Sequence, residues 1–175
     1  NGNWTHTSGG TFNHNNGTVN FAPLIYGSSS IDVATNETFY NLKIEGHPQS
    51  YYINIASGDT LIVLGTFTHT TPLINNGTIE ARGNVVINST APGGTATISF
   101  LVDGDQTITT NGGTTASLNI NKPSGTVSIV AGTSSNLGIS SFTLSSGTFT
   151  STSGTLTLNG NWTHTSGGTF NHNNG

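Results

Sequence analysis

The chain has 175 residues with 3 Lys or Arg and 7 Asp or Glu, so it is sparsely charged and carries a net charge of −4. So few basic residues exclude a nucleic-acid footprint, which needs clustered Lys and Arg, and no run of about 18 apolar residues is present to span a bilayer. The absence of Cys excludes disulfides, thiolate catalysis and Cys-based zinc sites. Because Met is also absent, we expect the chain to be a piece of a longer protein.

Thr, Gly, Asn and Ser together make up more than half of the chain, which leaves disorder or an all-β fold as the two options. Hydrophobic residues amount to 31%, and most are Ile, Val, Leu and Phe in short alternating runs. Such alternation is typical of half-buried strands. The four common residue types have low helix propensity and no 3.6-residue apolar stripe appears, so we predict an all-β fold.

The beginning and the end of the chain carry the same sequence. Residues 1–17 read NGNWTHTSGGTFNHNNG, and residues 159–175 repeat all 17 positions at an offset of 158 residues. We therefore expect residues 1–158 to be one full tandem repeat of a continuous solenoid, and residues 159–175 to start the next copy. A boundary placed arbitrarily inside the same array is the alternative.

A shorter repeat runs through these 158 residues. A small polar residue is followed by an apolar residue, any residue and a second apolar residue, first at residues 18–21 and last at residues 155–158. The first apolar positions lie 18 to 23 residues apart, and a unit this short can bury its apolar side chains only by stacking on its neighbours. We predict that these positions form one inward core ladder, made of Val19, Leu42, Leu61, Ile79, Ile98, Leu118, Leu137 and Leu156.

This spacing predicts a parallel β-helix, or β-solenoid, of about eight coils of roughly 20 residues per 158-residue repeat. A second strand is expected in each coil, at pairs such as Val85 with Ile87 and Phe142 with Leu144. The residue before each core position is Thr, Ser or Asn, which predicts an outward polar ladder with hydrogen bonds along the axis. Its members are Thr18, Asn41, Thr60, Thr78, Thr97, Ser117, Asn136 and Thr155.

Segments such as LTLNGNWTHTSGGTFNHNNG at residues 156–175 and ETFYNLKI at residues 37–44 resemble the β-strand repeats of very large bacterial cell-surface and secreted proteins. They are similar in style to the solenoid shafts of filamentous-haemagglutinin-like adhesins. The resemblance covers essentially the whole chain and is one of pattern, so it transfers no catalytic or binding residues. It implies an extracellular shaft or fibre.

Two sets of residues, a pair of aspartates and the histidines, are candidates for catalysis or metal binding. Asp103 and Asp105 flank a glycine, which suits a solvated turn, a weak calcium site or a catalytic carboxylate pair, but the partner residues for the last two are not apparent. The histidines of one repeat fall on separate coils, too far apart to share a metal ion; they are His6, His14, His47 and His69. We therefore predict no catalytic residue, no metal site and no cofactor, and we do not expect an enzyme.

We expect a structural protein, a repeat unit of an extracellular or cell-surface filament that stacks end to end through continuous parallel β-sheet. Its partners would be further copies of the same repeat, joined covalently in tandem or as an end-to-end homopolymer, with neighbouring fibres as a further option. No nucleic acid and no membrane span are expected. The alternative is a tandem β-sandwich adhesin module that binds glycans or a surface through mixed antiparallel sheets.

Overall fold

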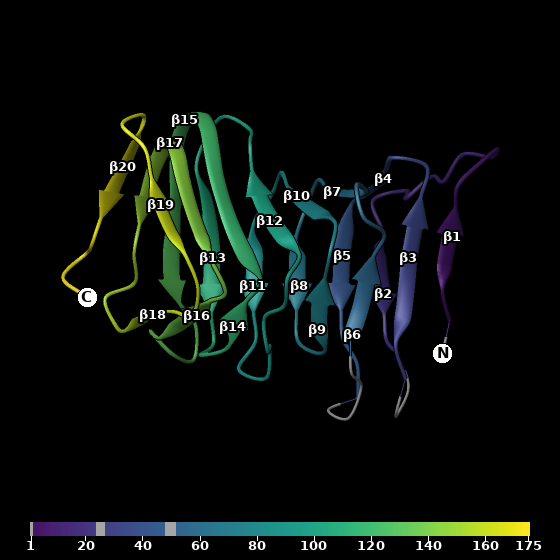
Figure 1. The fold of residues 1–175 in the computed structure, drawn as a ribbon, viewed down its shortest axis with the longest axis horizontal. Coiled ribbons are helices and arrows are strands. Elements are labelled where there is room, and N and C mark those ends of the chain that lie inside the picture. The colour runs from purple at the N-terminus through teal and green to yellow at the C-terminus, as the bar shows by residue number, and fades with distance from the viewer. Residues whose placement is uncertain (1, 24–26, 48–51) are drawn as a thin grey trace.

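The protein is a parallel β-solenoid of about seven turns, seen in a computed structural model that describes residues 2–23, 27–47 and 52–175. The described residues form strands, turns and irregular corners, and they contain no helix. The strands stack along the long axis of the molecule, and the two ends of the chain lie at its opposite ends (Figure 1). The predicted fold class is therefore confirmed.

Each turn passes through three faces in a fixed order. The first face contains β1 (Trp4–His6), β3 (Ser29–Val33), β6 (Tyr52–Ile55), β9 (Leu73–Asn75), β14 (Thr114–Thr115), β16 (Leu137–Ile139) and β18 (Leu156–Leu158). The second contains β4 (Asn36–Phe39), β7 (Thr60–Val63), β10 (Thr78–Ala81), β12 (Thr97–Phe100), the first parts of β15 (Ser117–Ala131) and β17 (Phe142–Thr150), and β19 (Trp162–His164). The third contains β2 (Thr18–Phe21), β5 (Asn41–Ile44), β8 (Phe67–His69), β11 (Val85–Ile87), β13 (Gln106–Thr110), the second parts of β15 and β17, and β20 (Gly168–Asn171).

The first face is continuous although its strands fall into two hydrogen-bonded groups. The first four strands end at β9, where the Ile74 amide donates to the Gly93 carbonyl at 3.0 Å. Pro92 in turn bridges Thr114 of β14, which begins the remaining strands. One turn in the middle therefore crosses this face as a bridge rather than as a strand.

All strand pairs found among the described residues are parallel. A β-sandwich is built from antiparallel strands joined by hairpins and Greek-key connections. The alternative prediction of a β-sandwich is therefore wrong, because each strand pairs with strands about one turn away rather than with its neighbour in sequence.

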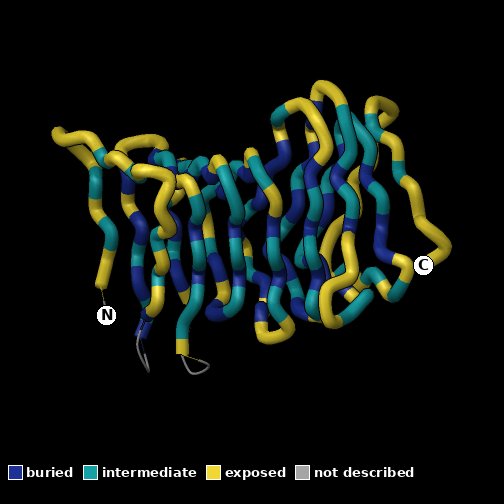
Figure 2. The backbone as a smooth tube through the Cα atoms, turned by 180° about the vertical axis from the view of Figure 1, so that it is seen from behind, coloured by how far each residue is buried: buried dark blue, intermediate teal, exposed yellow. Residues whose placement is uncertain are grey.

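Alternation along the strands separates the core from the surface. In β7, Leu61 and Val63 are buried, whereas Thr60 and Ile62 are half-buried on the outer side. The same alternation recurs through successive turns, so buried positions form continuous lines along the axis (Figure 2). Thr and Asn between the apolar residues occupy the outer side, where water solvates their hydroxyl and amide groups.

The two longest strands bend through a corner between the second and third faces. β15 turns at Gly125, which has φ of 88°, and β17 turns at Gly147, which has φ of 80°. A Cβ on Gly125 would lie 2.3 Å from the carbonyl oxygen of Gly104 in the preceding turn. Glycine is required there because the turns approach closely and because other residues rarely adopt such a φ.

A search of the described residues finds no helix with the length and apolar character needed to cross a membrane.

A pair of substitutions in β7 tests which side of the strand faces the core. We expect Leu61→Ala to lower the free energy of unfolding by about 2–5 kcal/mol, because it leaves a cavity in a fully buried row. Ile62→Ala, one residue further and on the outer side, should cost less than about 1 kcal/mol. Urea titrations followed by circular dichroism measure both, and equal losses would contradict the assigned alternation.

Candidate functional site

The eight residues of the predicted core ladder face inward, but they do not form one row. Six of them are at most 1% exposed, and Val19 and Leu156 are half-buried and packed against the core. They divide among the faces as follows: Val19 with Leu42 on the third, Leu61, Ile79, Ile98 and Leu118 on the second, and Leu137 with Leu156 on the first. The prediction of a single ladder is therefore wrong.

The physical reason is that all three faces share the same alternation of apolar and polar residues. The motif used to align the coils occurs on each face, so the motif alone does not identify the face. The steps from Leu42 to Leu61 and from Leu118 to Leu137 cover two faces instead of three. Counting them as full coils raised the number from about seven turns to eight.

The predicted outward polar ladder divides in the same way. Thr60, Thr78, Thr97 and Ser117 pair directly on the second face, Thr18 pairs with Asn41 on the third, and Asn136 and Thr155 lie beside the first. Two hydrogen bonds follow this set along the axis. The Asn41 amide donates to the Thr18 hydroxyl at 3.4 Å, and the Thr155 backbone amide donates to Asn136 Oδ1 at 2.9 Å.

A more regular polar feature lies at the corners, and sequence analysis missed it. A side-chain oxygen of Asn or Asp accepts a hydrogen bond from the backbone amide of a Thr or Ser one turn later. The pairs, at 2.8 to 3.3 Å, are Asn3–Ser30, Asn41–Thr66, Asn75–Thr95, Asn84–Thr107, Asp105–Thr126, Asn111–Thr133 and Asn136–Thr155. These bonds satisfy backbone amides at the corners and near the beginnings of strands, so each turn holds the next.

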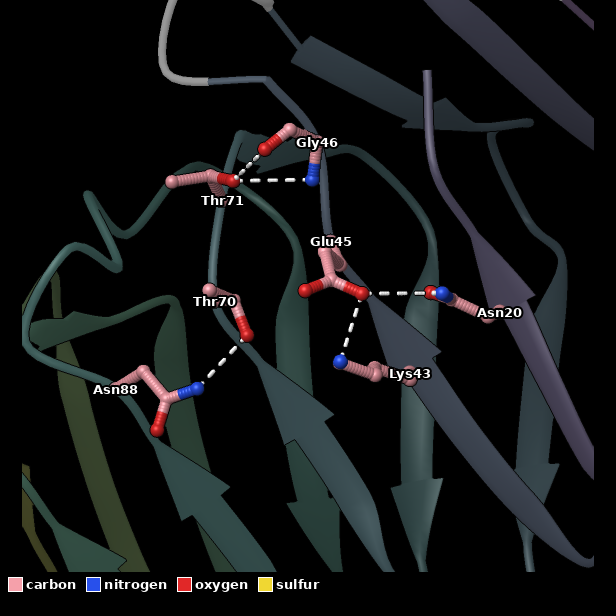
Figure 3. Close-up of polar contacts among 7 residues, drawn as sticks. All are labelled: Asn20, Lys43, Glu45, Gly46, Thr70, Thr71 and Asn88. Carbon is pink, nitrogen blue, oxygen red and sulfur yellow. Dashed lines mark hydrogen bonds and ion pairs between the residues drawn. The ribbon is translucent and has the colours of Figure 1, made fainter. Parts of the chain in front are cut away.

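The third face also carries polar contacts between turns near its amino-terminal end (Figure 3). The Glu45 carboxylate lies 2.6 Å from the Lys43 ammonium and accepts a hydrogen bond from the Asn20 amide at 3.1 Å. Lys43 first, and then Asn20, hold the pKa of the Glu45 carboxyl below its ordinary value. Nearby, the Asn88 amide donates to the Thr70 hydroxyl at 2.8 Å.

The two aspartates considered for calcium binding or catalysis act as corner supports. Asp103 Oδ1 accepts a hydrogen bond from the Ser124 hydroxyl at 2.9 Å, and Asp105 Oδ1 accepts one from the Thr126 backbone amide at 2.8 Å. Both donors lie in the following turn. Among the described residues, no group of three His, Cys, Asp or Glu side chains comes together as a metal site.

The histidines that the structure describes occupy different surroundings. His6 Nδ1 contacts the Glu37 carboxylate one turn later, and this hydrogen bond raises the pKa of His6, assisted by the Gly9 carbonyl. The half-buried His14 ring stacks on Tyr40 with ring centroids 5.9 Å apart. His69, by contrast, is fully buried on the third face.

His69 is a neutral core histidine. Its Nε2 donates to the Pro72 carbonyl at 2.7 Å, and its Nδ1 is buried without a hydrogen-bond partner. Its ring stacks on Phe67 at a centroid distance of 6.4 Å, and it replaces the apolar residue that other turns place there, such as Ile44 or Ile87. Burial lowers the pKa of His69 to about 4, because the charged ring loses its hydration.

A buried lysine joins three successive turns. Lys122 is 0% exposed, and burial lowers the pKa of its ammonium group. The Gln106 side-chain oxygen accepts a hydrogen bond from Lys122. The Gln106 side-chain amide in turn donates two hydrogen bonds to carbonyl groups of the preceding turn. The four bonds run from Lys122 Nζ to Val102 O at 2.6 Å and Gln106 Oε1 at 2.5 Å, and from Gln106 Nε2 to Ala81 O at 2.8 Å and Gly83 O at 2.7 Å. They satisfy carbonyl groups that the bulging corner leaves out of the sheet.

Both ends of the solenoid carry hollows lined by aromatic residues. At the amino-terminal end, Trp4 and Phe12 line a hollow of about 420 Å³. At the carboxy-terminal end, Leu156, Trp162 and Phe170 line one of about 540 Å³. These two hollows lie at the first and the last of the described turns.

Comparison with known proteins finds no matching family model, no matching curated protein and no matching solved structure.

The buried His69 predicts how stability depends on pH. The unfolded state binds the proton with a pKa near 6.5 and the folded state only near 4, so the contribution of His69 to stability is fully present above pH 6.5 and is lost as the pH drops towards 4. The loss should approach about 3 kcal/mol. Urea titrations at pH 7 and pH 4 should show that His69→Leu removes most of this difference, whereas the exposed-site variant His172→Ala retains it. A pH dependence unchanged in His69→Leu would contradict this assignment.

The corner role of Asp105 gives a second prediction. Asp105→Ala removes the acceptor for the Thr126 amide and should lower the free energy of unfolding by about 1–2 kcal/mol. Asp105→Asn keeps an oxygen at the same place and should retain most of the stability. Calcium or a chelator should leave the unfolding midpoint of the unmodified chain unchanged, and a marked calcium-dependent shift would argue for a metal site instead.

Proposed function

We propose that this chain is a structural repeat unit of an extracellular or cell-surface fibre, whose copies stack end to end through continuous parallel β-sheet. The observation that carries the proposal is a parallel ladder through the described turns, combined with a 17-residue beginning that returns at the end. Strand edges at both ends of such a ladder can pair further strands. The partners are further copies of the repeat, and the role is mechanical.

The charges on the described surface support a fibre held by packing rather than by electrostatics. Lys43 and Arg82 each lie 2.6 Å from a glutamate, Glu45 and Glu80 respectively, and the third basic residue, Lys122, is buried. Exposed ion pairs of this kind contribute at most about 1 kcal/mol each. We therefore propose that salt leaves the fibre intact, since few charges are present to screen.

The contacts of the candidate catalytic residues favour a structural role over an enzymatic one. Asp103 and Asp105 each hold a donor of the next turn, and His69 is sealed in the core. A carboxylate pair for hydrolysis needs free oxygens on either side of a substrate. We accordingly assign these residues to the stacking of turns, and we propose no reaction for the chain.

Oriented fibres of a chain that contains several copies of residues 1–158 test the proposal. We expect X-ray fibre diffraction to show a meridional spacing of about 4.8 Å, and electron microscopy to show thin unbranched filaments with an axial rise of roughly 34 Å per repeat, since about seven turns advance by one strand spacing each. Filaments should persist in high salt. Compact separate particles, or strands spaced across rather than along the fibre, would contradict the proposal, and urea-unfolded material serves as the control.

A further inference from the structure

The identical sequences at the two ends lie on different faces of the solenoid. In the first copy, β1 lies on the first face, where Trp4 pairs with Ile31. In the second copy, the same three residues form β19 on the second face, where Trp162 pairs with Phe142. Identical residues 158 positions apart therefore differ in position by one face.

The number of turns explains this difference. Seven turns separate β1 from β18 on the first face, counting the bridge at Pro92 as one crossing. β19 then follows one face later. One tandem repeat thus occupies seven turns and a third, and the next copy starts a third of a turn ahead of the first.

The aromatic contact inside the repeated segment is the same on both faces, although the backbone differs: Gly9 and Gly10 have positive φ, whereas their counterparts do not, and residues 168–171 form β20. Trp4 and Phe12 meet edge to face, with centroids 5.1 Å apart and planes at 85°. Trp162 and Phe170 meet in the same way, at 5.0 Å and 90°. The segment therefore keeps its own aromatic contact while its position around the axis changes.

One member of this aromatic group in the first copy has no counterpart among the described residues of the second. Phe21, on the strand that follows the repeated segment, packs edge to face on Trp4 at 5.9 Å. At the other end, the corresponding side of the turn is the hollow of about 540 Å³ beside Leu156, Leu158 and Trp162. Trp162 is 40% exposed there.

We propose that this end receives a second copy of the repeat turned by one face, so that the Thr18–Phe21 strand of the second copy pairs with β18. This inference rests on the proposed function, since it assumes that copies join end to end. Val19 and Phe21 of the second copy face inward over Leu156 and Leu158, and Phe21 completes the group around Trp162. Each strand of that copy lies one face further round than its counterpart here.

The same arrangement would also complete a histidine contact. His6 uses Nδ1 for the Glu37 carboxylate of the next turn, and its Nε2 lies 2.8 Å from the Gly9 carbonyl. His164, the same residue in the second copy, has Nε2 2.9 Å from the carbonyl of Gly168, which is the counterpart of Gly10 rather than of Gly9. The counterpart of Glu37 belongs to the next copy, which would bring it to His164 Nδ1.

Disulfide trapping tests the rotation because the chain has no cysteine of its own. The chain is lengthened at Gly175 by a second copy of residues 18–44, in which Asn20 is replaced by Cys. Combined with Thr157→Cys in β18, this residue should form a disulfide on mild oxidation, since neighbouring strands lie about 4.8 Å apart. Combined with Thr169→Cys in β20, it should not. Trapping at Thr169 instead, or at neither position, would overturn the proposal.

A control in the chain of 175 residues fixes the starting face. Thr143 and Thr163 are direct partners on the second face, so Thr143→Cys with Thr163→Cys should also cross-link, and failure would overturn the rotation at its origin. The outcome is separable from the proposed function. If the chains cross-link as expected but the natural protein forms no filaments, the proposed fibre function is refuted and the rotated joint between copies still stands.

Fluorescence tests the filling of the hollow. With Trp4→Phe, Trp162 is the only tryptophan, and the added copy should shift its emission to shorter wavelength and remove most of its quenching by acrylamide. The same added copy carrying Phe21→Ser should leave emission and quenching close to those of the shorter chain. An added copy that leaves Trp162 as exposed as before would contradict the joint, whatever its effect on stability.

Discussion

The constraint on which this structure depends is that each strand finds its hydrogen-bond partners about one turn away. A turn cannot satisfy its own backbone groups, because its three strands lie on three different faces. Parallel register then brings inward positions of successive turns into direct contact, such as Leu61, Ile79 and Ile98. Backbone pairing and apolar burial are therefore achieved by the same stacking, and neither is possible without it.

Polar groups inside the solenoid follow the same constraint. Lys122 and Gln106 lie where a wide corner turns carbonyl groups away from the sheet, and their side chains replace the missing donors. His69 occupies a place in a row that is otherwise mostly apolar and keeps one nitrogen without a partner. Asn and Asp side chains at other corners bind the amides of the following turn. Stability thus comes from bonds between turns at the corners as well as on the faces.

Much of this fold could be predicted from sequence. The remainder could not, because alternation of apolar and polar residues does not determine which face a strand occupies. Alternating Ile, Val, Leu and Phe with a spacing near one turn predicts stacked parallel strands and the inward side of each. The same alternation on all three faces hides which face a strand occupies, which is why Leu42 and Leu61 were assigned to one row. The corner bonds of Asn84 and Asn111 join residues 22 or 23 positions apart, and Asn and Thr are too common here for such pairs to stand out. Burial of Lys122 has no signal in the sequence.

The repeated segment, residues 1–17 and 159–175, folds on two different faces. The face that a strand occupies is therefore determined by the preceding turn and not by the residues of the strand itself. A strand with its corner is consequently an interchangeable module. Deleting one such module, or inserting another, would move everything beyond it by one face around the axis and change the strand pairs only where the two parts meet. An insertion or deletion that would disrupt a closed globular domain only changes, in this architecture, the direction in which later turns face around the axis. Surface residues can thus be moved to another side of the solenoid while the core stays the same.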